Sequence, residues 1–363
     1  MKQAARFQLQ EHGSDNLFEF SINHRFSPDV QQKSRLFTAI IPCIIGIGYL
    51  YQAFATIRDQ RNYPPPGTLV DIDGCRMHAQ TEGNGLPSVV LESGLGGMSS
   101  GWGWVQPETA KFSRVISYDR AGLGWSGPDT SPKTAVLAAR RLDTILQNAR
   151  VDPPYVLVGH SMGGLLIRVF ANLYPDKVAG MVFLDAVHPD QHLRSAAIDL
   201  HMRTGFRLLK LIPLLTRLGY VRITGLFNAW SNGLPARQAS ETLAFLSNYQ
   251  HLKTTRDESL AWNTICAEVR STSGLGDTPL AVVSAGRDVL PGQPELQREL
   301  ATLSSNSFHH VIKDADHVSL ITRRENALSV VKAIKHVVEM AFAQGQWNKP
   351  QPGLQRPKVR NLR

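Results

Sequence analysis

Short apolar runs alternate with amphipathic helical patterns from residue 68 to residue 343. Apolar runs that are typical of buried strands occupy 88–92, 115–118, 155–158, 178–184, 280–284 and 308–312. Helical spacing of apolar residues follows within 131–149, 165–173 and 326–343, with Ser131-Pro132 as the expected start of the first helix. Alternating strands and helices predict an α/β fold with a mostly parallel, doubly wound sheet that carries helices on both faces.

Residues 186–277 interrupt this alternation with a long, mostly helical pattern between two predicted strands. An insertion of this size at the carboxyl edge of the sheet predicts a helical cap over the site. Its most apolar stretch, 206–221, contains interspersed basic residues. Two interpretations stay open for its leucines: they form the core of the cap itself, or they face a substrate or a membrane.

An uncharged stretch of 21 residues, 36–56, precedes the alternating pattern. As a helix it would extend about 31 Å, close to the hydrocarbon thickness of a bilayer. We therefore predict a transmembrane anchor, followed by a proline-rich linker. The expected organisation is an N-terminal extension, the anchor, the linker, the α/β domain and a basic tail: 1–35, 36–56, 57–67, 68–343 and 344–363.

Two alternatives to an anchor remain for 36–56. Ala53-Phe54-Ala55 resembles a signal-peptidase site, although 35 residues with several acids precede the apolar stretch, and signal peptides begin with short basic regions. A buried helix of the main domain is the other alternative. Basic residues just before the stretch slightly outnumber those just after it, which favours a body outside the cytoplasm.

Charge and cysteine content exclude several classes of protein. The chain has 363 residues, with 39 Lys and Arg against 30 Asp and Glu. Five of the basic residues and no acidic residue lie in 344–363, so the body is close to neutral. A nucleic-acid groove requires an excess of basic residues on the folded surface. Because the body is nearly neutral, we do not expect the protein to bind nucleic acid. Three scattered cysteines are too few for a disulfide framework or a cysteine zinc site.

The strand at 155–158 runs directly into Gly159-His160-Ser161-Met162-Gly163-Gly164, and a helical pattern follows. A Gly-x-Ser-x-Gly sequence between a strand and a helix is typical of a nucleophile elbow, where a strained turn projects the serine hydroxyl from the sheet edge. Ser161 is therefore the candidate nucleophile.

A serine hydroxyl becomes a useful nucleophile when a histidine accepts its proton and a carboxylate orients that histidine. In this architecture the acid and the histidine follow the serine along the chain. His317 lies in a loop between the last predicted strand and helix and is the candidate base. Asp288 follows the strand at 280–284 and is the preferred acid, while Asp185, at the end of the strand 178–184, is its rival.

Acyl transfer also requires two backbone N–H groups that stabilise the oxyanion. We expect them at Met162, after the nucleophile, and at Leu95, in the glycine-rich turn after the strand 88–92. No metal site is expected, because His188 and His192 are separated by Pro189 and lack a third ligand nearby.

These motifs resemble the α/β-hydrolase fold family, in particular its serine hydrolases with a helical cap. The resemblance covers about 68–343 and is carried by SGLGG, YDRAGLGWS, GHSMGG, SAGRD and DADH, at 93–97, 118–126, 159–164, 284–288 and 314–317. It implies hydrolysis of a carboxylic ester or a related acyl bond of a small substrate, without a cofactor, and the apolar stretch of the cap suggests that this substrate is lipophilic. Membrane-tethered bacterial relatives are similar in having a PPPG linker after an apolar segment. An acyltransferase and a non-catalytic ligand-binding protein of this fold are the alternatives, and the sequence does not indicate an oligomeric state.

Overall fold

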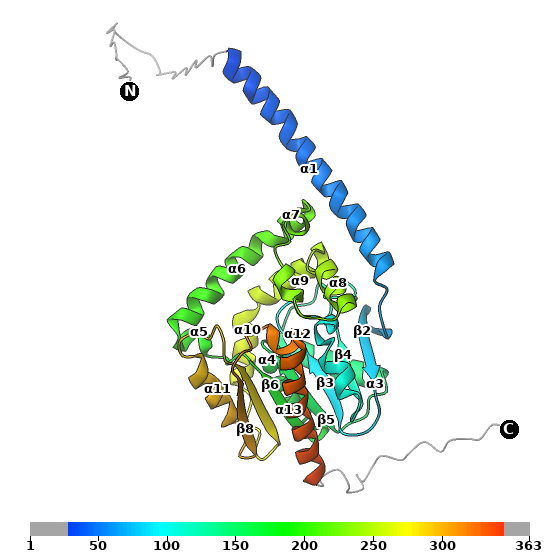
Figure 1. Cartoon of the computed structure of the whole chain (residues 1–363), viewed down its shortest axis with the longest axis vertical. Coiled ribbons are helices and arrows are strands. Elements are labelled where there is room, and N and C mark those ends of the chain that lie inside the picture. Colours follow the sequence, from blue (N-terminus) through cyan, green and yellow to red (C-terminus); the bar gives the residue numbers. More distant parts are fainter. Residues whose placement is uncertain (1–27, 345–363) are drawn as a thin grey trace, which may run out of the picture. The chain divides into compact units, whose positions relative to one another are not determined.

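The computed structural model describes residues 28–344, with side chains from residue 42 onward. Within this part of the chain, one eight-stranded sheet has the order β1-β2-β4-β3-β5-β6-β7-β8 (Figure 1). Strands β3 to β8 pair in parallel, whereas β1 and β2 pair antiparallel with each other, and β2 also pairs antiparallel with β4. The strands are Thr68–Ile72, Cys75–Glu82, Ser88–Glu92, Val115–Tyr118, Tyr155–His160, Val178–Leu184, Leu280–Ala285 and Ser307–Ile312.

The predicted mostly parallel α/β sheet is confirmed. All six strands expected from the sequence occur, with bounds that agree within two residues. The hairpin of β1 and β2 was not predicted, because its residues are partly exposed and mix polar with apolar side chains. The helix expected to start at Ser131-Pro132 instead begins at Ala135, since the Thr134 side chain accepts the Leu137 N–H and caps it.

Helices cover both faces of the sheet with separate apolar cores. One core contains residues of α3, α4 and α10, which are Ala135–Asn148, Gly163–Leu173 and Trp262–Arg270. The other contains residues of α2, α12 and α13, which are Val105–Thr109, Ser319–Thr322 and Arg324–Ala343. Helix α11, Gln293–Ala301, packs on β7 and β8 near one edge. Short 3-10 helices occupy Ser99–Trp102, Pro175–Lys177 and Asn228–Ser231.

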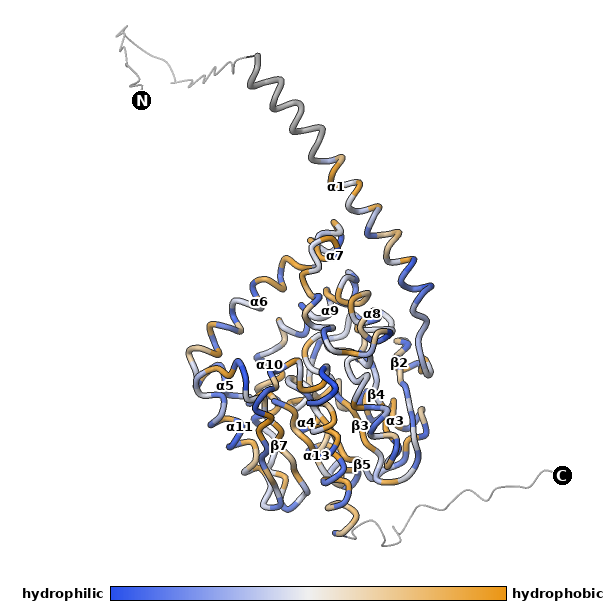
Figure 2. The backbone as a smooth tube through the Cα atoms, in the orientation of Figure 1, coloured by the Kyte–Doolittle hydropathy of each residue, from blue (hydrophilic) through white to orange (hydrophobic). Residues whose placement is uncertain are grey.

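Helices α5 to α9, from the chain between β6 and β7, form a group at one end of the sheet, which we call the cap (Figure 1). The cap helices α5 to α9 are Gln191–Arg194, Ala196–Arg217, Tyr220–Thr224, Ala236–Phe245 and Tyr249–Leu260. Ile212, Val221 and Leu252 form a small core of the cap. Leu208, Leu211 and Leu214 of α6 are instead exposed, and apolar residues recur along α6 in Figure 2. The leucines of α6 thus divide between a core face and an exposed face.

Helix α1, Pro28–Asn62, is longer than the predicted anchor. It includes 57–62 of the predicted linker, so that only 63–67 lie outside the helix. Its C-terminal part packs against the cap: Gln52 Nε2 donates to Ser247 O at 2.6 Å, and Arg222 pairs with Asp59 at 2.7 Å. The opposite side of this part exposes Ile47, Leu50 and Phe54. Within the described part of the chain, no helix combines the length and the apolar character that a membrane span requires.

Candidate active site

Ser161 occupies the sharp turn between β5 and α4 with a φ of 55°, a left-handed conformation that non-glycine residues rarely adopt. Its N–H donates to Leu184 O at 3.0 Å. The turn is crowded: a Cβ on Gly163 would lie 2.4 Å from Glu92 O, so any larger residue there would push α4 away from β3. The strain and the crowding are those expected of a nucleophile elbow, and they leave the Ser161 side chain half-buried.

His317 lies between β8 and α12, and the nearest carboxylate is that of Asp185. His317 Nδ1 and Asp185 Oδ2 are 2.7 Å apart, so the ring donates from Nδ1 and its Nε2 is left as the acceptor. Asp185 is buried and also accepts the Ala285 N–H at 3.2 Å and Gln293 Nε2 at 3.2 Å. Burial raises the pKa of Asp185, but the hydrogen bonds from His317 and Ala285 outweigh it and hold this pKa below its ordinary value.

The prediction that Asp288 orients His317 is wrong in this structure. Gly286 and Arg287 donate their N–H groups to Ala315 O at 3.1 and 2.9 Å, which folds the loop after β7 against the turn after β8. The Asp288 side chain is 77% exposed, and its partner is Arg287, at 3.4 Å. Asp185 directly follows β6, the neighbour of β5 in the sheet, and therefore lies next to the elbow. The rival carboxylate occupies the position that the sequence analysis assigned to Asp288.

His160, immediately before Ser161, supports the loop that carries His317. Its Nε2 donates to the backbone oxygen of His317 at 2.9 Å, and the two rings stack with centroids 4.7 Å apart. Burial lowers the pKa of His160 to about 3, so its ring is neutral. No role was predicted for His160, because a histidine inside the elbow motif does not by itself indicate a partner.

The two predicted oxyanion donors have free N–H groups. Among the described residues, neither the Leu95 N–H nor the Met162 N–H has an acceptor. In the same turn, the N–H groups of Gly96 and Gly97 are engaged, by Glu258 at 3.2 Å and by Gly94 O at 3.0 Å. The carbonyl of Ser161, which shares its peptide with the Met162 N–H, accepts from Gly164 and Val187. Both donors therefore belong to peptides whose other polar groups are fixed.

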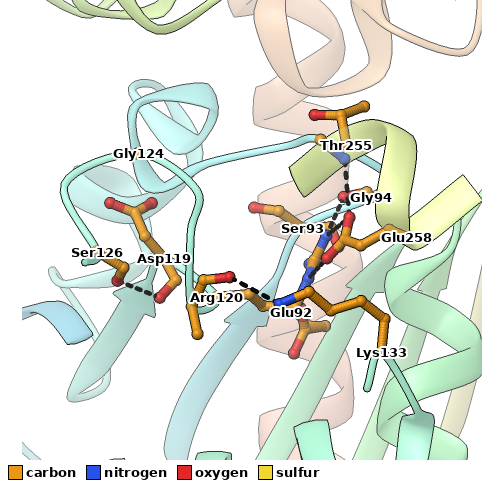
Figure 3. A network of polar contacts seen from close by, with 12 residues as sticks. Glu92, Ser93, Gly94, Asp119, Arg120, Gly124, Ser126, Lys133, Thr255 and Glu258 are labelled. Carbon is orange, nitrogen blue, oxygen red and sulfur yellow. Dashed lines mark hydrogen bonds and ion pairs between the residues drawn. The ribbon is translucent and has the colours of Figure 1, made fainter. Parts of the chain in front are cut away.

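A buried polar network lies beneath the turn at 93–97 and was not expected from the sequence (Figure 3). Arg120, which follows β4, donates to Glu92, to Glu258 and to the carbonyl oxygens of Ser93 and Gly94. Asp119 accepts N–H groups from Ser99 and Trp125 and so holds its own turn. Glu258 belongs to the cap helix α9, so this network connects the cap with the turn at 93–97.

Buried histidines make the stability of the fold sensitive to acid. Burial lowers the pKa of His251 in α9 to about 4, and that of His160 to about 3. In the unfolded chain both groups would titrate near pH ~6.5. As the pH falls below that value, the unfolded state binds protons that the folded state does not, so the free energy of unfolding decreases. Each histidine contributes a slope of about 1.4 kcal/mol per pH unit.

We therefore expect the free energy of unfolding to fall steadily between pH ~6.5 and ~4.5, measured by urea denaturation. His251→Gln should reduce this slope by the contribution of about one proton, which is about 1.4 kcal/mol per pH unit. His201 is exposed, and His201→Gln should leave the slope unchanged. An identical slope in wild type and His251→Gln would show that His251 is protonated in the folded state.

Comparisons with known proteins agree with this architecture. The sequence profile of a family described as alpha/beta hydrolase fold matches residues 87–323, well over half of the chain. The uncharacterized protein YqjL of Bacillus subtilis is 35% identical over 115 residues, which are 31% of this chain and 46% of that protein. The alignments span about half of the length of the curated relatives, or less.

Solved structures of hydrolases share the fold. A thermophilic esterase from Thermogutta terrifontis superposes with a TM-score of 0.56 and 21% identity, covering 76% of this chain and 97% of that chain. The Cif epoxide hydrolase from Acinetobacter nosocomialis superposes with a TM-score of 0.64 and 15% identity, covering 80% and 96%. At these identities the similarity establishes the fold alone. Together with the profile match, it confirms the resemblance seen in the motifs: the chain belongs to the alpha/beta hydrolase fold family.

Proposed function

We propose that this chain is a serine hydrolase that cleaves a carboxylic ester or a related acyl bond with Ser161, His317 and Asp185. The observation that carries the proposal is the 2.7 Å hydrogen bond between His317 Nδ1 and the buried Asp185, beside a serine in a strained elbow. Together these residues provide a nucleophile, a base and an acid that orients the base.

In the proposed reaction, Ser161 Oγ attacks the carbonyl carbon of the substrate and His317 Nε2 accepts the hydroxyl proton. Asp185 holds the Nδ1–H tautomer and stabilises the imidazolium that forms. The N–H groups of Leu95 and Met162 would donate to the developing oxyanion, a contribution of about 3–4 kcal/mol per donor in related chemistry. His317 then returns its proton to the leaving alcohol, and an acyl-enzyme remains on Ser161.

Water completes the cycle by the same steps in reverse order. His317 Nε2 takes a proton from a water molecule, whose oxygen attacks the acyl carbon, and the Ser161 Oγ–acyl bond breaks as the proton returns to Ser161. An alcohol or amine in place of water would make the chain an acyltransferase on the same residues. The name of the epoxide hydrolase neighbour does not argue for that activity, because epoxide hydrolases of this fold use an aspartate nucleophile and this chain has Ser161.

A lipophilic acyl substrate is the class that we infer, since the cap helix α6 exposes Leu208, Leu211 and Leu214 at this end of the sheet. The test is a panel of p-nitrophenyl esters of increasing acyl length with the full chain, combined with labelling by a fluorophosphonate probe. We expect labelling and turnover, with a preference for longer acyl chains. Product analysis with an added alcohol separates hydrolysis from acyl transfer. Absence of both turnover and labelling would favour the ligand-binding alternative.

We also propose that the protein associates with a membrane through 36–56, with its catalytic body outside the cytoplasm. Two features of the described residues support the membrane association, whereas the orientation rests on the charge bias around 36–56. The C-terminal part of α1 exposes Phe54 and its apolar neighbours, and α6 exposes Leu208, Leu211 and Leu214 among basic residues, including Lys210. Exposed leucines interspersed with Lys and Arg are typical of helices that contact a lipid surface.

Membrane association predicts that the full-length protein stays in the pellet after carbonate extraction of membranes. Protease added to spheroplasts should digest the body, if it lies outside the cytoplasm. Release by carbonate would contradict the anchor, and a protected body would reverse the orientation. A mature N-terminus at Thr56 would show instead that the segment is a cleaved signal peptide.

A further inference from the structure

The peptide that carries the Leu95 N–H is held from behind by Arg120. The Gly94 carbonyl and the Leu95 N–H belong to one planar, trans peptide and point in opposite directions. Arg120 Nη2 donates to Gly94 O at 2.7 Å, while Nη1 donates to Ser93 O at 2.7 Å. The guanidinium therefore fixes the direction of the Leu95 N–H. A charged donor on the carbonyl also polarises the peptide and makes its N–H a stronger donor.

Arg120 is in turn held by the cap. Glu258 of α9 accepts from Arg120 Nε at 2.7 Å through Oε1 and from Nη2 at 3.0 Å through Oε2 (Figure 3). Burial opposes the charge of Arg120, but Glu258 and Glu92 raise its pKa, so the guanidinium stays charged. A bidentate, buried pair of this kind fixes both the position and the orientation of the guanidinium plane.

The next glycine of the turn, Gly96, is attached to α9 directly. Glu258 Oε2 accepts the Gly96 N–H at 3.2 Å, and His251 Nε2 donates to Gly96 O at 2.9 Å. His251 Nδ1 accepts the Gly124 N–H at 3.0 Å, which places its proton on Nε2. Gly96 has a φ of +62°, and a Cβ there would lie 2.6 Å from Thr255. Helix α9 thus closely covers the turn and binds both polar groups of Gly96.

We propose that Glu258 is a positioning residue for the oxyanion donor: from the cap helix α9 it holds Arg120, and Arg120 aims and polarises the Leu95 N–H. This inference rests on the proposed acyl-transfer function and adds a role for the cap in the chemical step, beyond covering the substrate. If the cap holds the donor through Glu258, loosening this contact weakens binding of the transition state more than binding of the substrate.

Glu258→Gln tests the proposal, because it preserves the shape of the side chain and removes the charge that holds Arg120. We expect kcat for a p-nitrophenyl ester to fall by about ten- to a hundredfold, with KM changed by less than about twofold. The rate of fluorophosphonate labelling should fall with kcat, since phosphonylation of the serine uses the same donor. Asp257→Asn is the matched control: it is the preceding residue of α9, and it pairs with Lys253 and Arg256 away from the turn.

An unchanged kcat in folded Glu258→Gln, or a loss confined to KM, would overturn the proposal. So would an equal loss of kcat in Asp257→Asn, which would indicate a general effect on α9. If Glu258→Gln does not fold, Arg120→Lys is measured in the same assay. Lysine keeps the charge but cannot contact Gly94 O and both Glu258 oxygens together, so kcat should fall in the same way. An unchanged kcat in folded Arg120→Lys would overturn the proposal. A wild-type protein with neither turnover nor labelling would refute the proposed function itself, which separates the two failures.

Discussion

Replacing Ser161 with alanine is expected to remove the activity while leaving the fold in place. Without the hydroxyl no acyl-enzyme can form, and loss of the nucleophile in a serine triad lowers kcat by about six orders of magnitude. Alanine fits the left-handed φ of 55° about as well as serine, so the elbow should keep its conformation. The measurements are turnover of a p-nitrophenyl ester, fluorophosphonate labelling and the midpoint of thermal unfolding.

The exposed Ser271→Ala at the end of α10 is the control, and it should label and turn over as the wild type does. Turnover above background in Ser161→Ala would mean that another group is the nucleophile. Loss of labelling together with a lower midpoint of unfolding would trace the effect to the fold and not to the chemistry.

Asp185→Asn should have the second largest effect, a fall in kcat of about four orders of magnitude. The amide keeps an oxygen that can still accept the Ala285 N–H. It loses the charge that stabilises the His317 imidazolium, and it can present an N–H to Nδ1, which favours the unproductive tautomer. The measurement is kcat across pH ~6 to ~9, with thermal unfolding to verify the fold.

The matched control is Asp288→Asn, at the exposed carboxylate that the sequence analysis preferred. We expect it to retain nearly wild-type kcat, because Asp288 contacts Arg287 and not His317. The opposite result, a damaging Asp288→Asn beside a silent Asp185→Asn, would restore the assignment made from the sequence.

The two acids illustrate a limit of motif analysis in this fold. Asp185 and Asp288 both follow a strand of the parallel sheet, so both lie at its carboxyl edge. Their distinction depends on how the loops fold: two hydrogen bonds to Ala315 O shape the loop before Asp288, while Asp185 lies next to the elbow. Such contacts join residues far apart in the sequence, and no local pattern encodes them.

The polar face of α9 has a regular pattern in the sequence, but that pattern alone predicts the wrong environment. His251, Thr254, Thr255 and Glu258 recur at helical spacing and form one stripe, and all four are buried. From the sequence, a stripe of polar residues on a helix indicates a solvent-exposed face, because burial of unpaired polar groups is unfavourable. Here His251 and Glu258 are paired with the turn at 96 and with Arg120, so the face lies inward.

Local patterns along the chain are sufficient to predict the strands and the elbow of this protein. Continuous apolar runs predict buried parallel strands, and glycines around Ser161 indicate the strained turn, because both follow from the steric and hydrophobic requirements of a few adjacent residues. The tertiary structure alone decided which carboxylate reaches His317 and which helix supports the turn at Leu95. Those choices depend on hydrogen bonds between segments more than 100 residues apart, such as His317 with Asp185 and Gly96 with Glu258, and their geometry exists only once the sheet and the cap have packed.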